Sequence, residues 1–194
     1  TRVVEKGCRH LSTVSLIDIG CGNGWILDSI EKTFGDRATL CGIEPSHVGY
    51  QNSRQRLPRA TILHGTLNEL LPLGPFSVAV CSEVIEHVAD SKSFIDDLAS
   101  VLSPGGMLVM TTPNGRFRNE YFQETGAQPQ PVENWLRSSD LCDQLSTRFA
   151  VKEYLTFDSS FWFTTHPTAD TIRRILFRIR GGPTIHRMVE RTLG

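Results

Sequence analysis

Length, composition and charge set bounds on this chain. Its 194 residues, of which 39% are hydrophobic and 21% charged, suffice for one globular domain with a sizeable core, so we predict a single domain over residues 1–194. The formal net charge of −1 disfavours a nucleic-acid-binding protein, which usually carries a clear basic excess.

Cysteine use and hydropathy bear on location. The five cysteines are scattered and form no C-x-x-C pair, which is typical of reduced thiols rather than of disulfides or a zinc site. No apolar run approaches the roughly 18 residues of a membrane span, and the polar residues 1–6 do not resemble a signal peptide. We therefore expect a cytoplasmic protein without a transmembrane segment.

The first strong pattern is a strand followed by a glycine turn and a helix. Residues 14–19 are mostly apolar and rich in β-branched residues, as in a strand that is buried on both faces. Gly20, Gly22 and Gly24 follow at alternate positions, and a helical apolar pattern begins at Trp25. This order is the plan of a nucleotide-binding crossover, because glycines let a ligand lie against main-chain N–H groups at a helix N-terminus.

The spacing of the glycines narrows the choice of ligand. A dinucleotide fingerprint, G-x-G-x-x-G, would need a third glycine where Trp25 stands. A phosphate-binding P-loop would end in Gly-Lys-Ser/Thr, and no lysine follows Gly24. The acid at the start of the turn, Asp18, instead favours a ligand that carries a positive charge.

The stretch Leu16 to Leu27 resembles the first motif of the class I S-adenosylmethionine-dependent methyltransferases. That resemblance implies S-adenosyl-L-methionine as the cofactor. The residues of the turn that it implies for cofactor binding are Asp18, Gly20, Cys21, Gly22, Asn23, Gly24 and Trp25.

A second strand, within residues 40–46, carries an acid at position 44, twenty residues beyond Gly24 (44 − 24). In doubly wound folds such an acid accepts hydrogen bonds from both ribose hydroxyls. We therefore add Glu44 and its neighbour Pro45 to the predicted cofactor site.

The next elements continue the alternation of helix and strand. Ser46 is a good N-cap for a helix that runs to about Leu57, and a short third strand covers residues 61–64. By resemblance, the turn after this strand lies beside the adenine, which assigns cofactor contacts to Thr66 and Leu67. Leu67 fits equally well as a simple core residue.

Two further strands are expected over residues 76–81 and 107–112, with a helix from about residue 91 to 102 between them. Because only a crossover helix returns the chain in the same direction, this alternation predicts a doubly wound, Rossmann-like parallel α/β sheet with helices on both faces. Ligands collect at the carboxyl ends of such strands. Cys81 and Ser82 are therefore predicted to contact the cofactor.

The segment Cys81 to Val88 resembles the corresponding part of the ubiquinone-biosynthesis-type O-methyltransferases and of small-RNA 2′-O-methyltransferases, in which an E-x-x-E-H arrangement occurs. Glu83, Glu86 and His87 occupy those positions. On a helix they would share one face and could bind a divalent cation, whereas the alternative is a metal-free site with His87 as general base. We predict His87 and Glu83 as catalytic and leave the metal open. The small-RNA family also has a histidine just before a tryptophan in the loop after the fifth strand. The residues that precede Trp135 here, 131–134, include no histidine, which disfavours the RNA-methyltransferase interpretation.

The last part of the chain is less regular. Residues 116–137 are polar and aromatic, which predicts a substrate lid, and a short helix to about residue 145 and a sixth strand over 149–157 follow. Residues 168–194 suggest a basic helical tail that packs on the body or contacts a membrane or an acidic carrier protein. No seventh strand is evident.

Together these patterns predict a methyltransferase that acts on a hydroxyl of a small biosynthetic substrate, with residues 14–115 as its cofactor-binding core. An N- or C-methyltransferase of a small molecule is the nearest alternative, since the cofactor half does not encode the accepting atom. A non-catalytic module that binds S-adenosylmethionine is the alternative from another class. No nucleic-acid partner is expected.

Overall fold

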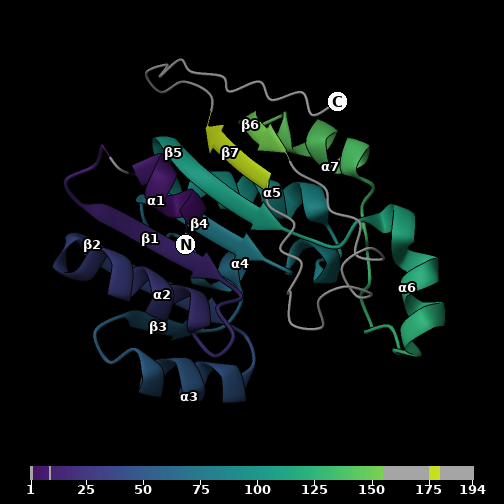
Figure 1. The fold of residues 1–194 in the computed structure, drawn as a ribbon, viewed down its shortest axis with the longest axis horizontal. Coiled ribbons are helices and arrows are strands. Elements are labelled where there is room, and N and C mark those ends of the chain that lie inside the picture. The colour runs from purple at the N-terminus through teal and green to yellow at the C-terminus, as the bar shows by residue number, and fades with distance from the viewer. Residues whose placement is uncertain (1, 9, 155–174, 180–194) are drawn as a thin grey trace.

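A mixed β-sheet forms the middle layer of the computed structural model, which describes residues 2–8, 10–154 and 175–179. Within these residues the sheet has seven strands in the order β3-β2-β1-β4-β5-β7-β6 (Figure 1). Its five parallel strands are β1 (Val14–Ile19), β2 (Ala38–Glu44), β3 (Thr61–His64), β4 (Phe76–Ser82) and β5 (Leu102–Thr111). The chain order reverses between β1 and β4, which is the arrangement of a doubly wound fold.

The far edge of the sheet corrects the prediction for the tail. β7 (Ile175–Ile179) lies antiparallel between β5 and β6 (Phe149–Tyr154), so a seventh strand exists where a helix was expected. A short apolar run fits a helix and a strand equally well, and here pairing with β5 satisfies backbone groups that would otherwise form an open sheet edge. The rest of the expected tail, 168–174 and 180–194, lies outside the described residues, as do positions 155–157 of the expected sixth strand.

Helices cover both faces of the sheet (Figure 1). Their bounds are α1 (Arg2–Cys8), α2 (Trp25–Phe34), α3 (His47–Arg56), α4 (Leu67–Leu70), α5 (Ser91–Ser100), α6 (Arg118–Thr125) and α7 (Ser138–Leu145), with single 3₁₀ turns η1 (Gly35–Arg37), η2 (Ile85–His87) and η3 (Gly115–Phe117). Ser46 caps α3 as predicted, since its hydroxyl accepts a hydrogen bond from the N–H of Gly49. None of the helices in the described ranges is long and apolar enough to cross a membrane.

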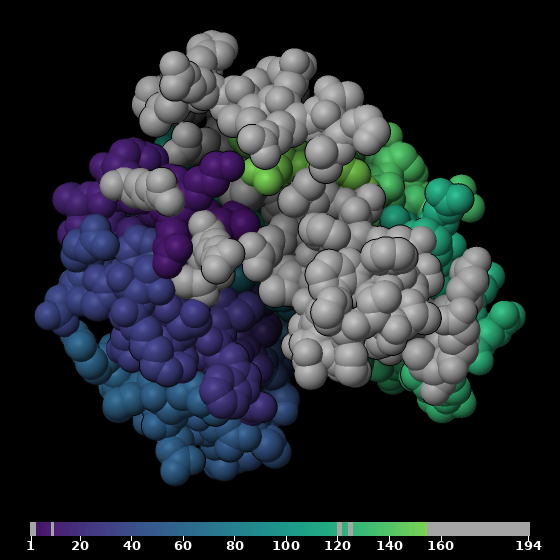
Figure 2. Space-filling view, in the orientation of Figure 1, coloured from purple at the N-terminus to yellow at the C-terminus, as the bar shows by residue number. Residues whose placement is uncertain are grey.

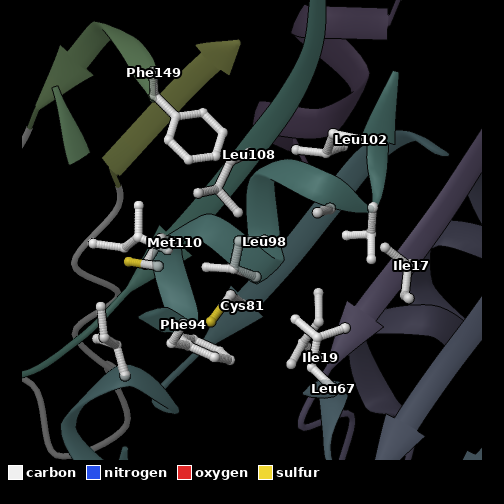
Figure 3. Close-up of a cluster of buried hydrophobic side chains, with 14 of the residues drawn as sticks. Ile17, Ile19, Leu67, Cys81, Phe94, Leu98, Leu102, Leu108, Met110 and Phe149 are labelled. Carbon is white, nitrogen blue, oxygen red and sulfur yellow. The ribbon is translucent and has the colours of Figure 1, made fainter. Parts of the chain in front are cut away.

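Two buried clusters form the core because successive residues of a strand point to opposite faces of the sheet. Ile17 and Ile19 of β1 pack in one cluster with α5, α7 and β6 (Figure 3). Val14 and Leu16 pack in the other, with α1 and α2. β1 is therefore buried on both faces, as its continuous apolar run predicted.

The segment over residues 116–137, in which the sequence indicated no regular element, contains helical structure. η3 and α6 occupy its first half. In Figure 2, α6 lies on one side of the face shown, and α2 and α3 lie on the opposite side. The sequence of α6 lacks the apolar stripe of a typical surface helix, which is why periodicity did not reveal it.

Gly24 supports the start of α2 and gives a first testable expectation. Its φ is +79°, and an added Cβ would lie 2.8 Å from Cδ1 of Leu57 and 3.2 Å from Cβ of Ser53. Gly24→Ala should therefore destabilise the chain by about 2 kcal/mol or more, lowering the Tm in thermal melts by roughly 4–8 °C. The control is Gly126→Ala, which has the same left-handed strain without a neighbour within 4 Å and should lose less. Equal losses would contradict the steric argument.

Candidate active site

The carboxyl ends of β1, β2 and β4 meet at one edge of the sheet, beside the point where the strand order reverses. The glycine turn follows β1 at this edge. Its conformation is fixed by the neighbouring strand, because the N–H groups of Gly20 and Cys21 both donate to the carbonyl of Ile43, at 2.8 and 2.9 Å. Gly20, Gly22 and Gly24 all have positive φ, so each needs glycine. An added Cβ on Gly22 would meet no atom within 4 Å, which leaves open space above the turn.

Glu44 ends β2 and is held beside the turn. Its Oε2 accepts from the N–H of Gly22 at 2.8 Å, and its Oε1 accepts from the N–H of Ser46 at 2.9 Å. Only 8% of the residue is exposed. A carboxylate oxygen can accept two hydrogen bonds, so each oxygen of Glu44 keeps capacity for one more donor.

Asp18 lies below the turn, in the last part of β1. It is 1% exposed, and within the described residues neither of its carboxyl oxygens has a hydrogen-bond partner. Burial raises the pKa of Asp18 to about 8, and the negative charge of Glu44 adds to the shift. A cation held above the turn would favour the ionised form of this carboxyl.

Asn23 and Trp25, both predicted to bind cofactor, turn toward α3. The side chain of Asn23 accepts from the amide of Asn52 at 3.0 Å, and its carbonyl accepts from Nε of Arg56 at 2.8 Å. The guanidinium of Arg56 stacks over the indole of Trp25 at 3.3 Å from the ring centroid. These contacts place both side chains on the outer side of the turn.

Cys21, Cys81 and Leu67 are buried. Leu67 and Cys81 belong to the core cluster drawn in Figure 3. Burial raises the pKa of the Cys21 thiol to about 12 and that of Cys81 well above its ordinary value, so both thiols are neutral. Any contact that these residues make with a ligand therefore involves no thiolate.

Other predicted residues lie at the rim of the same edge. Thr66 caps α4, and its N–H donates to Oε2 of Glu69 at 2.8 Å in a capping box. The carbonyl of Pro45 contacts Nε2 of His64 at 3.1 Å. The hydroxyl of Ser82 is hydrogen-bonded to that of Thr111 at 2.8 Å, which joins the ends of β4 and β5.

Glu83 and Glu86 differ sharply in environment. Glu83 is exposed and has a φ of +56°, a strained conformation for a residue that is not glycine. Glu86 is 2% exposed, and its Oε2 accepts from the hydroxyl of Thr112 at 3.0 Å. Burial raises the pKa of Glu86 to about 7.

His87 is half-buried between Glu86 and the segment before Trp135. Its Nδ1 lies 3.2 Å from the carbonyl oxygen of Val132 and 3.8 Å from Oε1 of Glu133, and its Nε2 lies 3.9 Å from Oε1 of Glu86. Sequence reasoning missed Glu133, which lies near His87, and Thr112, which donates to Glu86. No sequence pattern marks contacts between residues so far apart in the chain.

The helix face on which a metal was considered does not form. Residues 85–87 make a single 3₁₀ turn, and Glu83 stands outside it. Within the ranges that the structure describes, no three His, Cys, Asp or Glu side chains gather closely enough to hold a metal ion.

Comparison with known proteins gives the family. The model of the methyltransferase domain family matches residues 5–160, so the chain belongs to that family. The resemblance to class I S-adenosylmethionine-dependent methyltransferases is thereby confirmed.

Individual relatives are more distant. A ubiquinone biosynthesis O-methyltransferase of Rhodopseudomonas palustris (strain BisB18) is 28% identical over 135 residues, 68% of this chain and 51% of that protein. A probable S-adenosylmethionine-dependent methyltransferase of Mycolicibacterium smegmatis (strain ATCC 700084 / mc(2)155) is 35% identical over 113 residues, 58% of this chain and 43% of that protein. The chain thus spans about half the length of the curated relatives it matches.

The fold is shared with solved methyltransferases. The N-methyltransferase NodS from Bradyrhizobium japonicum WM9, solved in complex with S-adenosyl-L-homocysteine, superposes with a TM-score of 0.68. The two are 13% identical, and the match covers 92% of this chain and 84% of that one. The similarity confirms the predicted Rossmann-like α/β fold.

Proposed function

We propose that this chain uses S-adenosyl-L-methionine to methylate a hydroxyl group of a small molecule. The observation that carries the proposal is the carboxylate of Glu44, which is buried, fixed by two backbone N–H groups and still able to accept from two hydroxyls. A ribose offers two such hydroxyls side by side. The unpartnered carboxyl of Asp18 and the open space above Gly22 fit the positive charge and the bulk of the same ligand.

The residues that would hold the cofactor are those predicted from the sequence. Glu44 would bind the ribose, the backbone of the glycine turn would line the chain that bears the sulfur, and the turn at Thr66 and Leu67 would flank the adenine. The remaining members of this proposed set are Asp18, Cys21, Asn23, Trp25, Pro45, Cys81 and Ser82. When bound, the cofactor supplies a methyl group attached to a positively charged sulfur.

His87 is the proposed base. Its ring would take the proton of the acceptor's hydroxyl while the hydroxyl oxygen forms its bond to the methyl carbon, and the electron pair of the broken C–S bond stays on sulfur. Glu83, exposed at the end of β4, would help to orient the acceptor. The relatives that are named O-methyltransferases support a hydroxyl as the accepting group.

One observation favours an amine acceptor as the second candidate. Two carboxyl groups, those of Glu86 and Glu133, lie within 4 Å of the His87 ring nitrogens, and in their ionised forms they would attract an ammonium group. The structural neighbour NodS is an N-methyltransferase.

We also propose that the chain is a single domain, that it is cytoplasmic, and that residues 116–137 act as a substrate lid.

We expect His87→Ala to lower the rate of methyl transfer by about 100-fold, because a positioned general base contributes that much or more. The affinity for S-adenosylhomocysteine should stay within about twofold of the unmodified chain, since His87 is not part of the proposed cofactor site. Transfer is measured with methyl-labelled S-adenosylmethionine and 3,4-dihydroxybenzoate as a hydroxyl probe. His10→Ala, which alters an exposed histidine, is the control.

The same assay separates the alternatives. Transfer to phenethylamine but not to the hydroxyl probe would support the N-methyltransferase. Cofactor binding with no transfer to either probe would favour the non-catalytic module. Absence of cofactor binding in calorimetry would overturn the whole proposal.

A further inference from the structure

The segment Val132 to Leu136, here called the strap, is fastened to the edge of the sheet on which His87 lies. The N–H of Asn134 donates to the carbonyl of Glu86 at 2.7 Å. The N–H of Gly115 donates to the carbonyl of Leu136 at 3.0 Å. Two backbone hydrogen bonds therefore hold the strap against η2 and η3, and its position relative to His87 is fixed.

The strap decides which ring nitrogen of His87 carries the proton. Nδ1 faces the carbonyl oxygen of Val132 at 3.2 Å, and a carbonyl oxygen can only accept a hydrogen bond. Nδ1 must therefore be the donor. The lone pair of the neutral ring is then on Nε2, which is the nitrogen that can take a proton.

Glu133 adds a charge at the same nitrogen. Its Oε1 lies 3.8 Å from Nδ1 of His87 and accepts from the N–H of Gln130 at 3.3 Å, and its Oε2 accepts from the indole N–H of Trp135. The side chain is only 9% exposed. A carboxylate so fixed and shielded from water interacts more strongly with a nearby positive charge than an exposed one does.

We propose that Glu133 is a positioning residue for His87. Together with the carbonyl of Val132 it holds the ring in the tautomer with the proton on Nδ1, and it stabilises the positive charge that the ring gains when Nε2 takes the acceptor's proton. The role rests on the proposed function, because it presupposes that His87 is the base. Trp135, whose indole N–H donates to Glu133, also packs against Phe122 of α6 with ring centroids 5.5 Å apart, so α6 and the strap, both within residues 116–137, are in contact.

The test is Glu133→Gln, which keeps the size and the acceptor for Trp135 but removes the charge. In ¹⁵N NMR spectra of histidine-labelled protein, the unmodified chain should show His87 protonated on Nδ1. In the variant, the amide oxygen stays with Trp135 and the NH₂ takes the place of Oε1, where it can donate to Nδ1 in competition with the Val132 carbonyl, so the variant should show a mixture of both tautomers. The kcat for transfer to 3,4-dihydroxybenzoate should fall about tenfold, with the dissociation constant of S-adenosylhomocysteine unchanged. Asp140→Asn, at an exposed carboxylate on α7, is the matched control and should change neither readout.

The outcomes are separable. An unchanged tautomer in Glu133→Gln, or an unmodified chain protonated on Nε2, would overturn the inference whatever the activity. The expected tautomer shift in a chain that transfers no methyl group would leave the positioning of His87 supported and refute the proposed function. If Glu133→Gln does not fold, Glu133→Asp draws the carboxylate away from Nδ1 and should lower kcat by a smaller factor, whereas an unchanged kcat in that variant would overturn the inference.

Discussion

Replacing Glu44 with alanine is expected to weaken the binding of S-adenosylhomocysteine by about 100-fold or more. Two hydrogen bonds from the ligand to a charged acceptor would be lost, each contributing roughly 1.5–3 kcal/mol. The change also removes the acceptor of the Gly22 and Ser46 N–H groups, so the turn loses its support from β2. Isothermal titration calorimetry measures the affinity, and circular dichroism should show that the chain still folds.

A matched control comes from the other end of β2. Asp36 is a carboxylate whose side chain is 88% exposed just before the strand begins, so Asp36→Ala should leave the affinity unchanged. Glu44→Gln should fall between the unmodified chain and the alanine variant, because an amide keeps one acceptor oxygen but turns its NH₂ toward a backbone donor. Binding that is unaltered in Glu44→Ala would remove the ribose assignment.

The parallel half of the sheet could be predicted because its signals are local. Buried runs, turns and caps near β1 to β5 lie within a few residues of the structure they specify, and the spacing from Gly24 to Glu44 reflects one crossover helix. The pairing of β7 is different, since it depends on β5, more than sixty residues earlier in the chain. A run of five residues such as Ile175–Ile179 does not specify the strand at the edge of the sheet with which it pairs.

The same difference between local and long-range signals applies to the candidate site, which consists of a cofactor side around the glycine turn and an acceptor side around His87. The glycine turn and Glu44 were predictable because their roles follow from backbone geometry that only certain residues permit. The surroundings of His87 were not, because a carbonyl at Val132 and a carboxylate at Glu133 reach it from 45 and 46 residues away along the chain (132 − 87 and 133 − 87). The conformation of Glu83 also contradicts the helical spacing on which a metal site was considered.

The second large effect is expected in the pH dependence of stability. The pKa of Asp18 is raised from 3.8 to about 8 and that of Glu86 from 4.5 to about 7, so the folded chain keeps these protons at pH values at which the unfolded chain has released them. The free energy of unfolding must then fall as the pH rises from about 4 to 8 and level off above the folded pKa values. A decrease on the order of 6 kcal/mol between pH 5 and pH 8 is expected from the two groups together, the larger part from Asp18, since one pKa unit corresponds to about 1.4 kcal/mol.

Two variants divide this decrease between the carboxyl groups. Asp18→Asn stays neutral at every pH and should show little loss between pH 7 and pH 8, whereas Glu86→Gln should lose stability there as the unmodified chain does. Urea unfolding at pH 5, 7 and 8 gives the free energies. A decrease in Asp18→Asn that parallels the unmodified chain would show that Asp18 is ionised in the folded state, and its carboxyl would then need a partner or water. If the expected result holds, a bound cation must draw the proton from Asp18, so the affinity for S-adenosylmethionine should rise with pH over the range in which the free chain loses stability.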